Sequence, residues 1–338
     1  MSFRVAIVGA TGLVGRTMLD VLAERQFPIA ELRLFASERS AGTIIEWKNL
    51  QLRVEPLTMD VARSGFDIAL FSAGSAVSRE YAPLFANYGT TVVDNSSAWR
   101  TDPNVPLVVP EVNAHRALEH HGIIANPNCS TIQLAVALAP IERLFNIVRV
   151  VVATYQSVSG AGARGLAQLD AELAGTEPTV RISSHPIAHN TVFHPIADDG
   201  WSEEERKMMR ELRRIMDRPD MAVIATCVRL PIYRSHAEAV WVECQHQIEL
   251  PALIELYRTA AGIEYVPENY PTPLTASGTN AVWIGRLRPD PSNPHALALW
   301  VVADNVRKGA ATNAVQILEV LVQNGRLSPA HSFAELRS

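Results

Sequence analysis

A cysteine in the segment "NPNCSTIQ" (residues 126–133) stands where the sequence could support nucleophilic chemistry. Cys129 follows the apolar run "GIIA" and an Asn-Pro-Asn turn, and the helical pattern "LAVALAPIERLF" comes directly after its segment. The N-terminus of a helix carries unpaired N–H groups and a partial positive charge, which lower the pKa of a thiol and stabilise the thiolate. The same N–H groups could receive the oxyanion that forms when a thiolate attacks a carbonyl carbon. We therefore predict that Cys129 is a nucleophile.

The other two cysteines, Cys227 and Cys244, lie inside apolar strand patterns, which predicts buried structural residues. Three cysteines in 338 residues make no disulfide framework, and no apolar run is long enough for a transmembrane helix. The N-terminus, "MSFRVAIVGA", begins a strand pattern and lacks the features of a signal peptide. The net charge of −5 offers no basic surface for nucleic acid. These features predict a cytoplasmic protein that binds neither nucleic acid nor membranes.

A glycine-rich turn near the N-terminus predicts a dinucleotide site. The stretch "FRVAIVGATGLVGRTMLDVLAE" combines a buried strand, a turn with G-x-x-G-x-x-G spacing and an amphipathic helix. Such glycines reverse the chain, let the backbone approach a pyrophosphate and let the helix pack against the strand, while the helix N-terminus attracts the phosphate charge. The residues of this turn that we predict to contact the cofactor are Gly9, Thr11, Gly12, Leu13, Val14 and Gly15.

The segment "SERSAG", after the second strand pattern, bears on the choice of cofactor. An NAD site usually presents a carboxylate to the ribose hydroxyl there, whereas the 2′-phosphate of NADP requires arginine and hydroxyl donors. Ser37, Arg39 and Ser40 match the second pattern, and Glu38 matches the first if its side chain faces the ribose. The segment favours NADP.

The remaining patterns predict two domains. "FDIALFSAG" and "TTVVDNSS" are typical of buried parallel strands, and longer strands follow from "IVRVVVATYQSVSGAG" onward, with helices near residues 164–174 and 203–216. The amphipathic segment "KGAATNAVQILEVLVQNG" predicts a last helix that returns to the first domain. We therefore predict an α/β fold. A Rossmann-type dinucleotide-binding domain (residues 1–126 and 307–338) carries an inserted α+β catalytic and dimerisation domain (127–306) with a mainly antiparallel sheet.

Several long blocks together resemble the aspartate-β-semialdehyde dehydrogenase family, nearly from end to end. They are "GATGLVG", "RSAG", "DNSSAWRTDPNVPLVVPEVN", "NPNCSTIQ", "TYQSVSGAG", "HAEAVWVE" and "DNVRKGAATNAVQI". The resemblance implies reversible, NADP-dependent reductive dephosphorylation of L-aspartyl-4-phosphate to L-aspartate-4-semialdehyde through a cysteine thioester. It also implies a place in the biosynthesis of lysine, diaminopimelate, threonine and methionine, and a homodimer or homotetramer.

The resemblance assigns catalytic roles to three residues of this chain. Cys129 is the nucleophile, Gln156 orients the acyl-enzyme, and His236 transfers a proton to the thiohemiacetal oxygen or from the thiol. Arg229, at the end of one strand pattern, is assigned to the substrate α-carboxylate, and His236 begins the next pattern. We expect these two strands to be antiparallel neighbours, which would bring the arginine and the histidine together. Ser235-His236-Ala237 replaces the usual Gly-His-Ser of the family, which predicts a shifted loop.

The resemblance also assigns substrate and cofactor contacts. Arg100 and Lys207 match phosphate-binding positions, Glu204 matches the residue that holds the ammonium group, and Asn128 is a further substrate contact. The spacing of Glu204 and Lys207 alone also suits a solvated i,i+3 pair on an exposed helix. Further cofactor contacts are expected at Ser72, Gly74, Ser159, Gly160 and Asn305.

The stretch "SSHPIAHNTVFHPIADDG" departs from the family and holds His185, His189 and His194. Because prolines interrupt it and no cysteine joins the histidines, we expect no metal site, and predict a loop near the substrate or at a subunit contact.

Three alternative functions remain at this point. N-acetyl-γ-glutamyl-phosphate reductase shares the chemistry, but its substrate lacks a free ammonium group and has no need for Glu204. Glyceraldehyde-phosphate dehydrogenase has a different cysteine block. A silent paralogue that acts as a scaffold would have lost the nucleophile, whereas this chain keeps Cys129, Gln156, Arg229 and His236.

Overall fold

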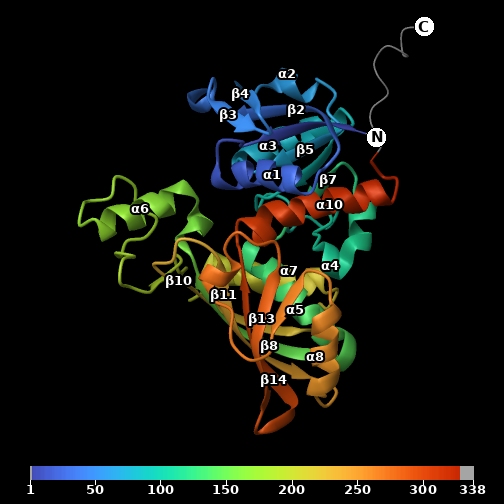
Figure 1. The fold of residues 1–338 in the computed structure, drawn as a ribbon, viewed down its shortest axis with the longest axis vertical. Helices are drawn as coiled ribbons and strands as arrows, with labels where there is room; N and C mark the ends of the chain where they lie inside the picture. Colours follow the sequence, from blue (N-terminus) through green and yellow to red (C-terminus); the bar gives the residue numbers. More distant parts are fainter. Residues whose placement is uncertain (1, 328–338) are drawn as a thin grey trace. The chain divides into compact units, whose positions relative to one another are not determined.

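The computed structural model describes residues 2–327, which form two compact units (Figure 1). Within this range, unit 1 comprises the chain up to Pro127 and from Ala310 onward, and unit 2 comprises Asn128–Gly309. No helix in this part of the chain has the length and apolar character needed to cross a bilayer.

Unit 1 is built on a seven-stranded sheet of order β3-β4-β2-β1-β5-β6-β7. All neighbouring pairs are parallel except β3·β4, which is an antiparallel hairpin. The strands are β1 (Phe3–Val8), β2 (Ile29–Ala36), β3 (Ile44–Trp47), β4 (Leu50–Pro56), β5 (Ile68–Phe71), β6 (Thr91–Asp94) and β7 (Ile123–Ala125). Strand order reverses on either side of β1, so the turns after β1 and β5 meet at the edge where parallel sheets bind nucleotides.

Helices cover this sheet, and the last one is contributed by the far end of the chain (Figure 1). They are α1 (Leu13–Glu24), η1 (Glu38–Ser40), α2 (Met59–Ala62), α3 (Ser75–Asn87), α4 (Pro110–Asn113), η2 (Ala114–Glu119) and α10 (Thr312–Gln323). Helix α10 packs against α1, and Val315, Leu318 and Leu321 of α10 are fully buried in the same apolar core as Met18 and Leu22 of α1. The apolar face of the last helix is therefore part of the core of unit 1.

Unit 2 contains a second seven-stranded sheet, of order β12-β13-β14-β11-β8-β10-β9. The strands are β8 (Ile147–Gln156), β9 (Val192–Phe193), β10 (Ala222–Arg229), β11 (His236–Cys244), β12 (Ile263–Val266), β13 (Val282–Asp290) and β14 (Asn293–Ala303). The sheet is mainly antiparallel, with parallel pairs at β12·β13 and β8·β10. The prediction that β10 and β11 are neighbours is wrong, because β8 lies between them and pairs with both. The short connection after Arg229 therefore crosses over one strand.

The helices of unit 2 include one central, almost wholly buried helix, α5 (Cys129–Phe145), which packs on the sheet and against α7 and α8. The others are η3 (Val158–Ala161), α6 (Ala163–Leu173), α7 (Glu203–Ile215), α8 (Leu250–Thr259), α9 (Pro273–Ala276) and the π-helical turn η4 (Arg307–Ala311), whose last two residues belong to unit 1. Helix α7 begins with a capping box in which Ser202 and Glu205 each bond the other's backbone N–H. Glu204, Met208 and Glu211 are among its buried residues.

Candidate active site

Cys129 is the first residue of α5, and Asn128 caps that helix. The Asn128 Oδ1 atom accepts the backbone N–H groups of Ser130 (3.0 Å) and Thr131 (3.3 Å). These two N–H groups are therefore already bonded, and the prediction that the first N–H groups of the helix await an oxyanion is wrong for them. The cap is itself anchored, because its backbone N–H donates to Glu211 Oε2 at 2.6 Å. Cys129 thus begins a helix whose first turn is fixed by the side chains of Asn128 and Glu211.

Gly309 lies close behind Cys129 in unit 2. A Cβ atom built on Gly309 would approach the Cys129 Cβ to 2.9 Å and its Cα to 3.3 Å, closer than packed side chains tolerate. Only a glycine fits at this position unless Cys129 moves.

Strand β8 brings three predicted residues together at one end of the sheet of unit 2. Gln156 ends β8 and pairs in register with Arg229, which ends β10. His236 begins β11 on the other side of β8, where Ala237 pairs with Tyr155. Gln156 and Arg229 are almost fully buried, and His236 is completely so. Because β8 lies between β10 and β11, Gln156 lies between the strand that ends with Arg229 and the strand that begins with His236.

The imidazole of His236 has a defined tautomer. Its Nδ1 atom accepts the backbone N–H of Ser157 at 3.0 Å, so the hydrogen of the neutral ring is on Nε2. Burial lowers the pKa of His236 to about 3, and the positive charge of Arg229 acts in the same direction. The ring is therefore neutral at physiological pH. Its Nε2 atom is buried without a hydrogen-bond partner among residues 2–327, so an N–H donor is available there.

A hydrogen-bonded cluster supports His236 from behind. Asn305 Oδ1 accepts from Ser157 Oγ (3.2 Å), Ser159 Oγ (3.1 Å) and the Ser235 backbone N–H (2.9 Å). Ser159 and Asn305, which we expected to contact the cofactor, are both buried in this cluster. Ser235 has φ +71°, the left-handed conformation that glycine adopts without strain. Ser235 thus has the backbone conformation expected of the glycine that the family usually has here. Its Oγ atom lies 2.9 Å from Ser277 Oγ.

Glu204 is the buried carboxylate of the site. Its Oε1 atom accepts from Asn128 Nδ2 (2.8 Å) and Gln156 Nε2 (3.3 Å), and Lys207 Nζ lies 3.4 Å from its Oε2. Burial by itself would raise the pKa of Glu204, but the charge of Lys207, that of His194 and these hydrogen bonds outweigh it and lower the pKa to about 2. The alternative of a solvated surface pair is wrong for Glu204, which is 9% exposed. Glu204 is therefore an ionised group with little exposure to solvent.

Arg229 is the buried cation of the same cluster. Its Nη1 atom donates to the Ser157 carbonyl at 2.8 Å, and the residue is 9% exposed. Burial lowers the pKa of Arg229, while the charges of Glu204 and Cys129 oppose that shift. A Cβ built on Gly160 would lie 3.4 Å from His236 Nε2 and 3.5 Å from Arg229 Nη1, so a glycine borders both groups. An anion could therefore meet the guanidinium and the imidazole N–H together.

In unit 1, the glycine turn after β1 is tightly packed. A Cβ on Gly9 (φ +90°) would lie 2.4 Å from the Ser72 carbonyl oxygen, and one on Gly15 would lie 2.3 Å from the Gly9 carbonyl oxygen. Gly12 caps α1 and offers its first turn no side-chain acceptor. Ser72 follows β5, and Gly74 (φ +87°) caps α3, where a Cβ would meet nothing within 4 Å. Uncapped N–H groups beside small residues are the features that suit a pyrophosphate.

The remaining predicted residues of the turn and of the cofactor-choice segment are partly or wholly exposed. Thr11, Leu13 and Val14 are partly buried at the start of α1. Ser37 follows the carboxyl end of β2, and Glu38, Arg39 and Ser40 form the short helix η1; of these four, only Ser40 is partly buried.

Arg100 also belongs to unit 1. Its Nε atom donates to the Asn126 carbonyl (2.9 Å) and its Nη2 atom to the Asn95 carbonyl (2.7 Å). These bonds fix the guanidinium beside the segment that leads into the cysteine turn.

Two family models match this chain. One, described as the semialdehyde dehydrogenase NAD binding domain, matches residues 4–120, and the other, the semialdehyde dehydrogenase dimerisation domain, matches residues 138–308. The aspartate-semialdehyde dehydrogenase of Aquifex aeolicus is 49% identical over 96% of this chain and 99% of its own length, and that of a Synechocystis species is 46% identical over 96% and 98%. The chain belongs to the aspartate-semialdehyde dehydrogenase family.

A solved member of the family has the same fold. The crystal structure of aspartate semialdehyde dehydrogenase II from Vibrio cholerae, complexed with ASA, is 45% identical in sequence and superposes with a TM-score of 0.91 over 96% of this chain and 99% of its own. The family membership and the shared fold bear out the resemblance on which the residue roles rest.

Sequence reasoning missed several residues that the structure brings to this site. Glu211, Ser130 and Gly309 contact predicted residues, and His194, which was named only as part of a loop, contacts Gln156. Glu211 could have been found from its spacing, because it lies seven residues after Glu204 and therefore on the same face of the helix. Nothing in the sequence distinguished His194 from its neighbours.

The histidine-rich segment is a loop that contains the short strand β9, and of its three histidines only His194 reaches the cluster. Its Nε2 atom lies 2.9 Å from Gln156 Oε1, whereas His185 and His189 are exposed. Among residues 2–327 no group of three histidine, cysteine or acidic residues could hold a metal ion. Cys227 and Cys244 are buried in strands, and burial raises the pKa of Cys244 to about 12.

Proposed function

We propose that this chain catalyses the reversible, NADP-dependent conversion of L-aspartate-4-semialdehyde and phosphate to L-aspartyl-4-phosphate through a thioester on Cys129. The observation that carries the proposal is the convergence, within unit 2, of a buried cation and a buried carboxylate around one amide. Gln156 lies in register with Arg229 and bonds to Glu204. Such a pair matches a substrate that carries both a carboxylate and an ammonium group.

Arg229 and Glu204 select the substrate. A guanidinium binds a carboxylate through two parallel hydrogen bonds, so Arg229 receives the α-carboxylate. Glu204 stays ionised because its pKa is about 2, and it receives the α-ammonium. A substrate whose nitrogen is acetylated offers Glu204 no ammonium, so the bound substrate would lose this ion pair while Lys207 remained the only cation close to the carboxylate. The pair therefore favours aspartate semialdehyde over acetylglutamate semialdehyde.

Cys129 supplies the covalent step. Its thiolate attacks the aldehyde carbon, an S–C bond forms, and the carbonyl electron pair becomes an oxyanion. Loss of hydride from that carbon restores the C=O bond and leaves a thioester; phosphate oxygen then attacks, and the thiolate departs. In the biosynthetic direction each bond change reverses. A bound nicotinamide supplies hydride acceptance in the first direction and hydride donation in the second.

His236 acts as a hydrogen-bond donor in this proposal. Because Ser157 N–H occupies Nδ1, the neutral ring can donate from Nε2 but cannot accept a proton there. The developing oxyanion is the group that needs such a donor, and a buried N–H is worth more to it than water. The geometry thus favours the thiohemiacetal oxygen over the thiol as the partner of His236.

Unit 1 would hold NADP. Gly9, Thr11, Gly12, Leu13, Val14 and Gly15, with Ser72 and Gly74, would border the pyrophosphate and the nicotinamide half. Arg39, with the hydroxyls of Ser37 and Ser40, would meet the 2′-phosphate from an exposed position. Glu38, also exposed, can turn toward water when that phosphate binds.

We propose Arg100, in unit 1, and Lys207, in unit 2, each as a phosphate contact, because each matches a phosphate-binding position of the family. Arg100 is oriented by two backbone carbonyls, and Lys207 lies beside Glu204 on α7. Phosphate is a substrate in one direction and a product in the other, so its site must bind a dianion without trapping it.

We further propose that the chain works in the cytoplasm as a homodimer or homotetramer, in the synthesis of lysine, diaminopimelate, threonine and methionine. The match of residues 138–308 to a dimerisation domain supports the oligomer.

The deciding experiment is a panel that crosses NADP and NAD with aspartate semialdehyde, acetylglutamate semialdehyde and glyceraldehyde 3-phosphate, with and without phosphate. We expect phosphate-dependent NADPH formation with aspartate semialdehyde. Turnover of acetylglutamate semialdehyde in its place would overturn the assignment, and no turnover with any aldehyde would support a scaffold role.

A further inference from the structure

The amide of Gln156 has only one favourable orientation. Its Nε2 atom donates to Ser130 Oγ at 2.9 Å and faces Glu204 Oε1 at 3.3 Å. Glu204 is ionised and can only accept hydrogen bonds, so the amide nitrogen, and not the oxygen, must face it. The Gln156 Oε1 atom consequently faces the other way, toward His194.

His194 must donate to that oxygen. An amide oxygen only accepts, so the contact of 2.9 Å requires a hydrogen on His194 Nε2. Burial lowers the pKa of His194, the charge of Glu204 opposes this shift, and Arg229 reinforces it. Lys207 also lowers the pKa, and Glu205 raises it. The neutral Nε2–H tautomer and the imidazolium both donate this bond, so the contact survives protonation.

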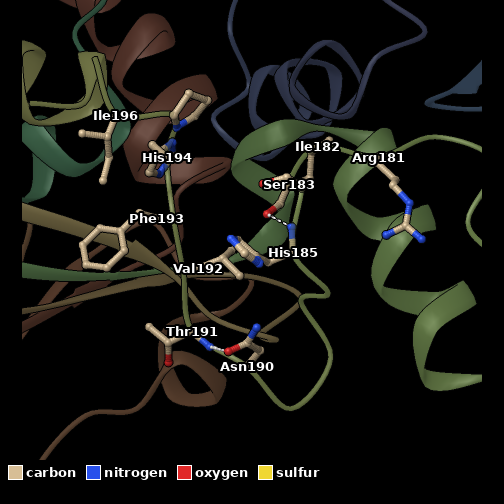
Figure 2. Close-up of a pocket in the computed structure, with 12 residues that line it drawn as sticks. Arg181, Ile182, Ser183, His185, Asn190, Thr191, Val192, Phe193, His194 and Ile196 are labelled. Carbon is tan, nitrogen blue, oxygen red and sulfur yellow. Dashed lines mark hydrogen bonds between the residues drawn. The ribbon is translucent and has the colours of Figure 1, made fainter. Parts of the chain in front are cut away.

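The fold holds His194 in place through its loop. Glu172 of α6 accepts the backbone N–H groups of Ile187 (2.6 Å) and Ala188 (2.8 Å). Beyond them, β9 pairs with β10, with Val192 opposite Arg229. His194 is the next residue after β9, and Figure 2 shows it among the residues that line a pocket of about 900 Å³, together with His185. The loop therefore delivers one histidine to Gln156 and leaves the other exposed.

We propose that His194 is a positioning residue that locks the Gln156 amide with its N–H groups toward the reacting acyl oxygen. This inference rests on the proposed function. The bond between Gln156 Nε2 and Glu204 is the longer of the two that this nitrogen donates, so a substrate oxygen can replace it. If the amide rotated by 180°, its oxygen would face both the Glu204 carboxylate and the acyl oxygen. His194 opposes this rotation through its bond to the Gln156 oxygen.

The first test compares His194→Leu, which removes the donor, with His194→Gln, which keeps one. We expect His194→Leu to lower kcat about tenfold, the value of one buried hydrogen bond, with KM values within about twofold. His194→Gln should recover to within about threefold of wild type. His185→Leu, on the exposed side of the same loop, is the matched control and should stay within about twofold. An unchanged kcat in His194→Leu, or no recovery in His194→Gln, would overturn the proposal.

A double-mutant cycle separates positioning from folding. If His194 acts only through Gln156, then Gln156→Leu/His194→Leu should be no slower than Gln156→Leu alone. Losses that multiply in the double variant would contradict this.

A measurement without turnover distinguishes this inference from the proposed function. Long-range ¹H–¹⁵N spectra of histidine-labelled protein, assigned with His194→Leu, should show His194 as the Nε2–H tautomer, and Gln156→Leu should shift its signal. An Nδ1–H tautomer would overturn the role of His194 even if the enzyme is active. An inactive wild-type protein with the expected tautomer would overturn only the proposed function.

Discussion

The glycine turn of unit 1 (residues 9–15) and the cluster at the strand ends of unit 2 are built from different kinds of residue. The turn relies on glycines, uncapped backbone N–H groups and an exposed arginine, Arg39. The cluster relies on ionisable side chains, Glu204, Arg229 and His236, each buried and held by hydrogen bonds. Phosphates remain partly solvated when bound, so a backbone and a mobile cation suffice to hold them. A reacting carbonyl requires fixed donors in a dry setting.

This difference predicts two kinds of mutant. Changes that remove or displace the reacting groups of unit 2 should lower kcat, because those groups act on the transition state, whereas changes at residues that bind phosphate or the cofactor should mainly raise the corresponding KM.

The largest effect is expected at Cys129. Cys129→Ala should lower turnover by at least about 10⁴-fold, because the covalent step has no other nucleophile. NADPH binding, followed by fluorescence titration, should stay within about twofold. Detection of an acyl-enzyme in this variant by intact mass would remove Cys129 from its role.

Gly309→Ala tests the packing behind the nucleophile. The added Cβ would lie 2.9 Å from the Cys129 Cβ, so Cys129 must shift. A misplacement of about 1 Å at a reacting atom costs roughly a hundredfold, and we expect kcat to fall by about that factor. The substitution should leave KM for NADP nearly unchanged, and circular dichroism should report an intact fold. A wild-type kcat would show that the cysteine tolerates displacement.

Lys207→Met tests the phosphate assignment within the cluster. Its KM for phosphate should rise at least about tenfold, about 1.4 kcal/mol, while that for aspartate semialdehyde changes less. Arg206→Met is the matched control, because Arg206 lies next along α7 and bonds to Asp199 at the surface. Equal effects of the two variants on phosphate KM would mean that Lys207 only supports Glu204.

Arg39→Ala tests the turn. Its KM for NADP should rise about fivefold, about 1 kcal/mol, because an exposed charge-assisted bond is worth that much. NAD lacks the 2′-phosphate, so its KM serves as the internal control and should not change. An equal rise in KM for NADP and for NAD would show that Arg39 stabilises the local structure and does not bind the 2′-phosphate.

The smallest effect is expected at Ser235. Ser235→Gly relieves a left-handed serine but loses the contact with Ser277, two changes of about 1 kcal/mol each and of opposite sign. Urea unfolding should therefore give a stability within about 1 kcal/mol of wild type. Ser277→Ala, which loses the same contact and also the bond from Ser277 Oγ to the Pro273 carbonyl without relieving any strain, should be less stable. Equal destabilisation by both variants would show that φ +71° carries no strain here.

The two regions also differed in how far sequence could predict them. The glycine turn occupies residues 9–15, so its spacing alone indicated a nucleotide site between β1 and α1. The cluster draws on residues from Asn128 to Gly309, and the resemblance to a family was needed to associate them. Its strand order was mispredicted, because β10 and β11 are consecutive in sequence yet separated by β8.

The burial of the site residues and their hydrogen-bond partners could not be predicted from the sequence. The i,i+3 spacing of Glu204 and Lys207 fits an exposed helix equally well, and only tertiary packing put Glu204 inside. Three histidines in one loop look alike until β9 pairs with β10 and delivers one of them to Gln156.

The discontinuous chain of unit 1 bears on how the protein is made. Its core needs Val315, Leu318 and Leu321 of α10, yet residues 128–309 must be synthesised before them. At about 5–20 residues per second, that interval lasts roughly 10–40 s. During this time unit 2 emerges as one contiguous segment and can begin to fold. The apolar surface of α1 is not yet covered by α10. Unit 1 is thus begun before unit 2 but completed after it, and the apolar face of α1 stays exposed until α10 has been made.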